Sequence, residues 1–264
     1  GTARPERYEA STKHGMRIDI VTIFPATVEA VFREGVVRRA INRDLINVQV
    51  HDLRDYTDDR HRSVDDAPYG GGPGMVLKYE PIFRAIDAIR GVAGQPDCVV
   101  LTSPQGKRFG HVDAERLSRL SRFVVICGRY EGVDERVREG LVTEELSIGD
   151  YVLTGGELPA MVIVDAVARL VPGVVGDAQS IESESFVRGL LDFPQYTRPA
   201  KVRALQVPET LLSGHHQRIS RWRKREAVRR TLDRRPDLLA QASLDDEERA
   251  ILQELLTGRE KETR

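Results

Sequence analysis

The stretch 123-FVVICGRYEGVDER-136 begins with an apolar, β-branched run and continues into a loop rich in glycine and charge. A short run of this kind, bounded by turn or polar residues, is typical of a β-strand. Similar runs occur at 17-RIDIVTI-23 and 98-CVVLT-102, with a weaker one at 46-INVQV-50, and helical patterns such as 25-PATVEAVFREGVVRRAI-41 stand between them. Strands that alternate with helices predict an α/β domain with a mainly parallel sheet.

The composition limits the class of protein. The chain has 264 residues, of which 40% are hydrophobic, enough for one large domain or two ordinary ones. Its longest apolar stretch, 160-AMVIVDAVARLV-171, contains two charged residues and is shorter than the roughly 20 residues that cross a bilayer. Cys98 and Cys127 each stand in an apolar run, which is typical of buried thiols in a reducing cytosol. We therefore expect a folded cytoplasmic protein without a membrane segment.

The character of the sequence changes along the chain. Residues 1–15 have no apolar core of a signal peptide, so we expect a disordered leader or remnant before Met16. Residues 16–175 carry the α/β pattern. The segment 176–190 is polar and rich in small residues, which predicts a flexible linker, and residues 191–264 are expected to form a smaller helical domain.

The net charge of −1 hides an asymmetry between two neighbouring regions. Residues 196–236 contain 12 Lys and Arg against 3 Asp and Glu, whereas residues 237–264 contain 4 against 8. A basic block of this size can bind a polyanion. A solvated helix surface explains the same charges, and the composition leaves both interpretations open.

The glycine-rich stretch 65-DDAPYGGGPGM-75 does not match the known phosphate loops. It lacks both GxxxxGK[ST] and a GxGxxG directly after a strand, and Pro73 has no amide hydrogen for an anion. Its glycines would let a flat base approach the backbone, and Asp65 and Asp66 could accept hydrogen bonds from the donor edge of guanine. A structural turn capped by an aspartate is an equal alternative.

Three further loops are rich in glycine and proline: 101-LTSPQG-106, 128-GRYEGVDER-136 and 147-SIGDYVLTGGELP-159. The first two follow strand-like runs, and the third precedes the apolar helix. Because α/β proteins bind ligands beyond the carboxyl ends of their strands, we expect these loops to form one site. Their backbone amides and carbonyls suit an uncharged heteroaromatic ring.

The motifs PYGGGPGM, SPQG, GRYEGVDER, SIGDYVLTGGELPAM and YTRP together resemble those of the bacterial tRNA (guanine-N1)-methyltransferases, the TrmD family of the SPOUT class. The resemblance extends from about Arg17 to beyond Trp222. It implies an α/β fold with a deep trefoil knot, a small all-helical C-terminal domain that binds tRNA, and a homodimer with a shared active site. The implied reaction is methyl transfer from S-adenosylmethionine to N1 of guanosine 37, 3′ of the anticodon of tRNA.

The resemblance also assigns the residues that hold the methyl donor. They lie in the three loops described above, and the fingerprint of Rossmann-type methyltransferases is missing. The implied cofactor-binding residues are Leu101, Thr102, Ser103, Pro104, Gln105, Gly106, Gly128, Tyr130, Glu131, Ser147, Ile148, Gly149, Asp150, Tyr151, Val152, Leu153, Gly155, Gly156 and Pro159.

The reaction needs a base beside N1 of guanine and a positive group near O6, because N1 carries a proton and negative charge accumulates on O6. By resemblance the base is Glu184, where the family typically has aspartate, and the positive group is Arg169; Asp65 matches a functionally important aspartate. Glu182 remains an alternative base. An i,i+4 ion pair with Asp165 would explain Arg169 without catalysis.

The resemblance assigns the basic block to the anticodon stem-loop of tRNA and Gly74 to the approach of guanine. Trp222 can stack on a base, although a tryptophan in an amphipathic helix is more often a core residue. The implied substrate-binding residues are Gly74, Arg198, Lys201, Arg221, Arg223 and Lys224. The family is described as needing a divalent cation such as Mg²⁺, but no residue here identifies its ligands, and 213-SGHH-216 alone is no metal site.

Two other functions remain open at this stage. Another knotted RNA methyltransferase would act on a ribose 2′-hydroxyl and would need no base at N1. A non-enzymatic RNA-binding protein would use the basic helices alone, with the loops serving only as structure.

Overall fold

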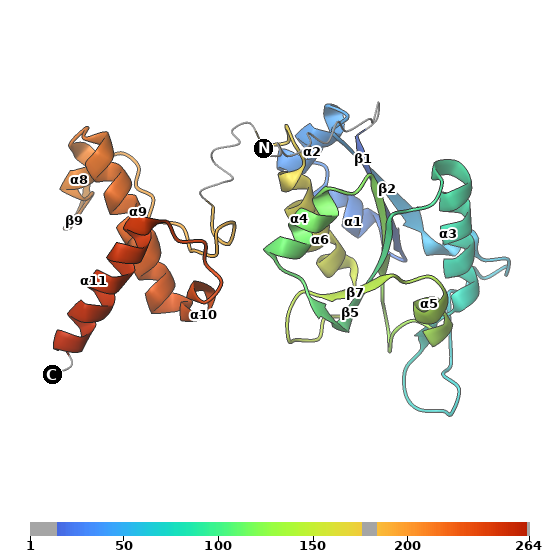
Figure 1. The fold of residues 1–264 in the computed structure, drawn as a ribbon. Helices are drawn as coiled ribbons and strands as arrows, with labels where there is room; N and C mark the ends of the chain where they lie inside the picture. The colour runs from blue at the N-terminus through green and yellow to red at the C-terminus, as the bar shows by residue number, and fades with distance from the viewer. Residues whose placement is uncertain (1–14, 176–183, 263–264) are drawn as a thin grey trace, which may run out of the picture. The chain divides into compact units, whose positions relative to one another are not determined.

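The computed structural model describes residues 15–175 and 184–262 of the chain. The chain divides into two compact units, Gly1–Gly176 and Asp177–Arg264 (Figure 1). The expected leader, except for Gly15, and residues 176–183 of the expected linker lie outside the described residues. In the described part of the chain, no helix combines the length and apolar character that crossing a membrane requires.

The N-terminal unit is built on a five-stranded sheet in which all neighbouring strands are parallel. The α/β domain with a parallel sheet, as predicted from the alternating runs, is therefore confirmed. In sheet order the strands are β2 (Ile46–Asp52), β1 (Met16–Thr22), β6 (Arg122–Cys127), β5 (Cys98–Arg108) and β7 (Glu144–Ser147).

Helices cover both faces of this sheet, because alternate residues of its central strands point into two separate cores. In β6, Phe123 and Val125 belong to one core, and Val124 and Ile126 to the other. Figure 1 shows the two helical layers on opposite sides of the strands. The first layer contains α1 (Pro25–Val31), α2 (Gly35–Asn42), α4 (His111–Ser118) and α6 (Glu157–Leu170); the second contains α3 (Tyr79–Ala93), α5 (Glu135–Gly140) and the short 3₁₀ helix η1 (Leu53–Tyr56).

The single helix expected over residues 25–41 is interrupted in the structure. The first helix, α1, ends at Val31, and α2 begins at Gly35. Gly35 has a φ angle of +75°, a left-handed conformation that breaks a right-handed helix. The apolar periodicity continues across the break because both helices pack on the same core.

The C-terminal unit is mainly helical, with α8 (Glu209–Leu212), α9 (His216–Arg234), α10 (Pro236–Leu239) and α11 (Asp246–Glu262). Its small core centres on Leu190, Val228 and Ile251. An all-helical domain was expected here, but a two-stranded antiparallel hairpin precedes α8. This hairpin consists of β8 (Lys201–Val202) and β9 (Leu205–Gln206), and Arg203 in its turn has a φ angle of +56°.

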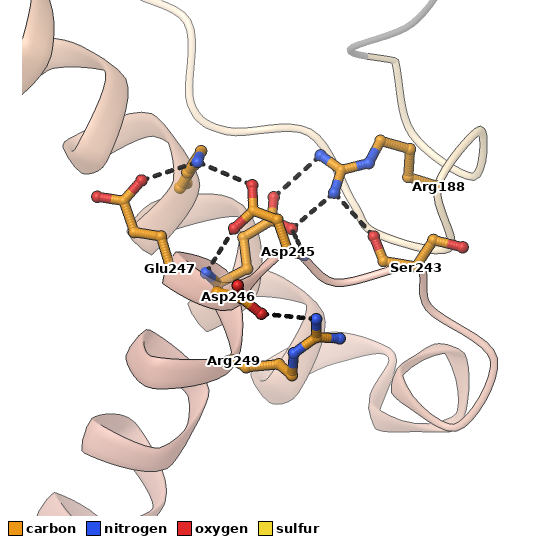
Figure 2. A network of polar contacts seen from close by, with 8 residues as sticks. Arg188, Ser243, Asp245, Asp246, Glu247 and Arg249 are labelled. Carbon is orange, nitrogen blue, oxygen red and sulfur yellow. Dashed lines mark hydrogen bonds and ion pairs between the residues drawn. The ribbon is translucent and has the colours of Figure 1, made fainter.

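The last part of the expected flexible linker, up to residue 190, is packed into the C-terminal unit (Figure 2). Arg188 binds the buried carboxylate of Glu248 at 2.7 and 3.1 Å and donates to the carbonyl oxygen of Ser243 at 2.7 Å. Glu248 and Asp245 also bind each other's backbone N–H groups, which forms a capping box at the start of α11. Arg188, within the expected linker, therefore makes polar contacts with the C-terminal unit.

Candidate functional site

A cavity of about 290 Å³ lies beside the middle of β5 and the carboxyl ends of β6 and β7. Its lining comes from all three loops that the sequence indicated as one site. Every cofactor-binding residue implied by the resemblance borders this cavity except Gly106 and Asp150. The volume is close to the lower end of the range of about 300–1,000 Å³ for small-molecule sites.

A large bulge in β5 creates the first wall of the cavity. Thr102 and Lys107 both pair with Leu146 of β7, so the residues between them leave the ladder and form the SPQG loop. Gly106 closes this bulge: a Cβ atom there would lie 2.5 Å from the backbone nitrogen of Leu146. Gly106 therefore lets β5 return to β7 instead of lining the cavity.

The start of α6 forms the second wall and fits tightly against β5 and the end of β6. The N–H of Gly156 donates to the carbonyl oxygen of Gly128 at 2.7 Å. A Cβ atom on Gly156 would lie only 1.9 Å from Oγ1 of Thr102 and 2.7 Å from the nitrogen of Gly128. Only glycine permits this close approach.

The loop after β7 forms the third wall. The hydroxyl of Ser147 donates to the carbonyl oxygen of Gly149 at 3.0 Å, and the hydroxyl of Tyr151 donates to that of Ile148 at 3.3 Å. Asp150 does not line the cavity, and its exposed carboxylate lies 3.7 Å from the guanidinium of Arg108.

A buried polar network beneath the cavity was not selected from the sequence. Glu157 is 4% exposed, and its two carboxylate oxygens bind the hydroxyl of Thr22 at 2.9 Å and the guanidinium of Arg129 at 3.1 Å. Arg129 also lies 4.5 Å from the ring centroid of Phe24. Burial, and then the nearby Glu157 carboxylate, raises the pKa of the Cys127 thiol.

Arg129 and Glu157 stand in two different motifs that the sequence indicated, and the contact between them exists only in the folded structure. Gly132, Val133, Glu135 and Thr154 also line the cavity and belong to the loops that the sequence indicated. Three further lining residues lie outside those loops and were not expected: Arg138, Glu145 and Leu146.

The glycine-rich stretch forms a hairpin that is attached to the same cavity. It connects β3 (Asp65–Asp66) with β4 (Val76–Leu77), and its four glycines have φ angles of +85°, +76°, +118° and +88°. The N–H of Glu131 donates to the carbonyl oxygen of Met75, and the N–H of Leu77 to that of Gly132, both at 3.0 Å.

Gly74 and Asp65 therefore lie on a hairpin held beside the cavity. A Cβ atom on Gly74 would lie 2.4 Å from Oε1 of Glu131, which is a cavity residue. Asp65 is half-buried and pairs with Leu77 in the hairpin ladder.

The two residues expected to act on the guanine ring belong to different units of the chain. Arg169 is half-buried in the last turn of α6, in the N-terminal unit. Glu184 is half-buried at the start of the described part of the C-terminal unit. The alternative base, Glu182, lies outside the described residues.

The cations expected to bind tRNA fall into two groups. Lys224 binds Asp245 at 2.8 Å and Glu247 at 2.7 Å, which raises its pKa, and Arg221 lies 3.5 Å from Glu254. These two neutralise acids of their own unit. The remaining three, Arg198, Lys201 and Arg223, are exposed and form no ion pair within residues 15–175 and 184–262.

No group of three or more His, Cys, Asp or Glu side chains that could hold a metal ion occurs in the part of the chain that the structure describes.

Comparisons with known proteins identify the family to which this sequence is similar. A family model described as tRNA (Guanine-1)-methyltransferase TrmD matches residues 16–241. A tRNA (guanine-N(1)-)-methyltransferase of Pelotomaculum thermopropionicum is 54% identical over 244 residues, which is 92% of this chain and 97% of the relative. Proteins of the same description from Dehalococcoides mccartyi and Geobacter metallireducens are each 50% identical, over 91% and 93% of this chain and 97% and 100% of their own lengths.

Proposed function

This chain belongs to the tRNA (guanine-1)-methyltransferase family TrmD, and we propose that it transfers a methyl group from S-adenosylmethionine to N1 of guanosine 37 in tRNA. The observation that carries the proposal is the cavity beside β5, β6 and β7, together with the glycine hairpin attached to it. The two features provide places for a cofactor and for a flat base next to each other.

The cavity suits the methyl donor by the chemistry of its walls. The glycines at 128, 155 and 156 keep side chains out of the cavity, while Leu101 and Pro159 offer apolar surface to the faces of an adenine ring. The carboxylate of Glu131 supplies negative charge near a sulfonium. When bound, S-adenosylmethionine supplies an electrophilic methyl group to the base.

Residues of both units act on the guanine ring in this proposal. Glu184 accepts the proton from N1, which turns N1 into a nucleophile, and Arg169 stabilises the negative charge that develops on O6. Asp65, on the hairpin, accepts hydrogen bonds from the donor edge of the base. The phosphates of the anticodon stem-loop are bound by the exposed cations of the C-terminal unit.

A homodimer with a shared active site is part of the proposal. Leu158 and Val162 are 53% and 47% exposed on the outer face of α6, and apolar side chains in this position suit contact with a second copy of the chain. The trefoil knot, the cytoplasmic location and a requirement for Mg²⁺ are further expectations drawn from the family.

One assay tests the proposed reaction against its two alternatives. The protein is incubated with S-adenosylmethionine labelled on the methyl group and with transfer RNAs that carry guanosine or adenosine at position 37. We expect label on N1 of guanosine 37 and none in the adenosine-37 RNA. Label on a ribose 2′-hydroxyl would indicate a ribose-specific RNA methyltransferase. RNA binding without any label would indicate a non-enzymatic RNA-binding protein.

A further inference from the structure

The C-terminal unit contains a second cavity, of about 400 Å³, that the proposed reaction does not use. It lies between the segment 193–200 and helices α8 and α9, entirely within this unit. Its volume falls within the range of about 300–1,000 Å³ for ligand sites. Leu211 and Ile219 form an apolar part of its lining.

Two aromatic rings stand on the wall of this cavity. The ring centroids of Tyr196 and Trp222 are 6.4 Å apart, and the ring planes are inclined by 53°. Tyr196 is 50% exposed, and Trp222 is half-buried at the cavity surface. Its place in a helix suggested that Trp222 is a core residue, but in the structure it is only half-buried and borders the cavity. Partly exposed aromatic rings provide faces on which another flat group can stack.

The charge of the lining is positive. Arg198 and Arg223 border the cavity, and its lining contains no Asp or Glu. The guanidinium of Arg223 lies 5.0 Å from the ring centroid of Phe193, which orients it at the wall. By contrast, Arg225 on another side of α9 binds Glu254 at 2.8 Å. Cations on that side are neutralised by α11, whereas those at the cavity remain available to an anion.

We propose that this cavity binds one unpaired nucleobase of the tRNA, stacked on Tyr196 and Trp222, with the adjacent phosphates held by Arg198 and Arg223. Aromatic stacking with cationic flanks is the usual way in which proteins bind single-stranded RNA. The inference rests on the proposed function only in that it takes tRNA as the substrate. It adds a second point of recognition, on a unit separate from the methyl-transfer cavity.

The first experiment uses the fact that Trp222 is the only tryptophan of the chain. A base that stacks on an indole ring quenches its fluorescence, so the full-length protein is titrated with tRNA while tryptophan emission is recorded. We expect saturable quenching with the same midpoint as tRNA binding measured on filters. An RNA duplex of equal length, which has phosphates but no unpaired base, should bind without this quenching.

The second experiment compares two substitutions at one position. Tyr196→Leu removes the ring, and we expect tRNA to bind roughly 5- to 100-fold more weakly, in line with the loss of one stacked base. Tyr196→Phe keeps the ring and should bind tRNA like the unchanged protein. Leu256→Ser, at a 40% exposed position on α11, is the control for surface substitution in the same unit. Circular dichroism checks that each variant is folded.

The outcomes separate this inference from the proposed function. Two outcomes would overturn the stacking site without touching the proposed function. One is that the protein transfers the methyl group and binds tRNA while Trp222 emission stays unchanged. The other is that Tyr196→Leu and Tyr196→Phe bind tRNA with equal affinity. Failure of the proposed function would appear as absence of label at N1 in the methylation assay.

Discussion

The two cavities of this protein are shaped by different parts of its residues, the backbone in one case and the side chains in the other. The cavity of the N-terminal unit is shaped by backbone, since glycines bring β5, the end of β6 and the start of α6 into contact. The cavity of the C-terminal unit is shaped by side chains, above all by the rings of Tyr196 and Trp222. An added methyl group should therefore damage the first cavity, whereas the second should respond to the loss of a ring.

The largest expected effect concerns the proposed general base of the reaction. Glu184→Gln removes the proposed base, so methyl transfer should fall by about 10²–10⁴-fold while S-adenosylmethionine still binds. Single-turnover kinetics and calorimetry of cofactor binding measure the two effects separately. Glu184→Asp, the matched control, keeps a carboxylate and should retain much of the rate. Unchanged turnover of the Gln variant would move the base to Glu182 or Asp65.

The next effect tests whether backbone contact shapes the N-terminal cavity. Gly156→Ala places a methyl group 1.9 Å from Oγ1 of Thr102, so we expect a loss of about 3 kcal/mol of stability and much weaker cofactor binding. Gly91→Ala, inside α3 with no atom near its Cβ position, should instead stabilise by about 0.5–1 kcal/mol. Denaturant unfolding measures both. Equal effects would refute the role assigned to close packing.

A smaller effect is expected from the ion pair that fastens the segment around residue 188 to the C-terminal unit. Arg188→Ala leaves the buried carboxylate of Glu248 without its partner, which should cost about 1.5–3 kcal/mol. Arg249→Ala breaks an exposed pair with Asp246, visible in the same network (Figure 2), and should cost at most about 1 kcal/mol. Thermal unfolding checks both, and cofactor affinity should remain unchanged in each.

The smallest effect separates phosphate contacts from stacking. Lys201→Ala should reduce the slope of log affinity for tRNA against log salt concentration by about 0.7–0.9, the value for one lost phosphate contact. Leu205→Ala, in the same hairpin, removes no charge and should leave the slope unchanged. Binding isotherms at several salt concentrations supply the slopes. An unaltered slope for Lys201→Ala would exclude a phosphate contact there.

The central strands were predictable because burial on both faces demands continuous apolar runs, as in β6. The edge strand β7 was missed, since Glu144 and Glu145 give it no such run, and its pairing with β5 exists only in the folded sheet. The hairpin β8–β9 is also too short to show a period. In each case the structure depends on contacts with another segment, which local sequence does not record.

The candidate site was predictable to the extent that it consists of contiguous loops. The motifs around Gly128 and Gly156 identified the cavity walls, because glycine is required at specific points along one segment. The network of Thr22, Arg129 and Glu157 was not predicted. Thr22 and Glu157 are 135 positions apart, and their contact follows only from the strand order of the sheet.

The positions of the two cysteines have a practical consequence for following the unfolding of this protein. Cys98 and Cys127 are 6% and 4% exposed within the N-terminal unit, and burial raises the pKa of both thiols, so labelling reagents should reach them only when that unit opens. Trp222 belongs to the other unit. Thiol labelling and indole emission, recorded during one denaturation, would therefore show whether the units open in a single step or one after the other.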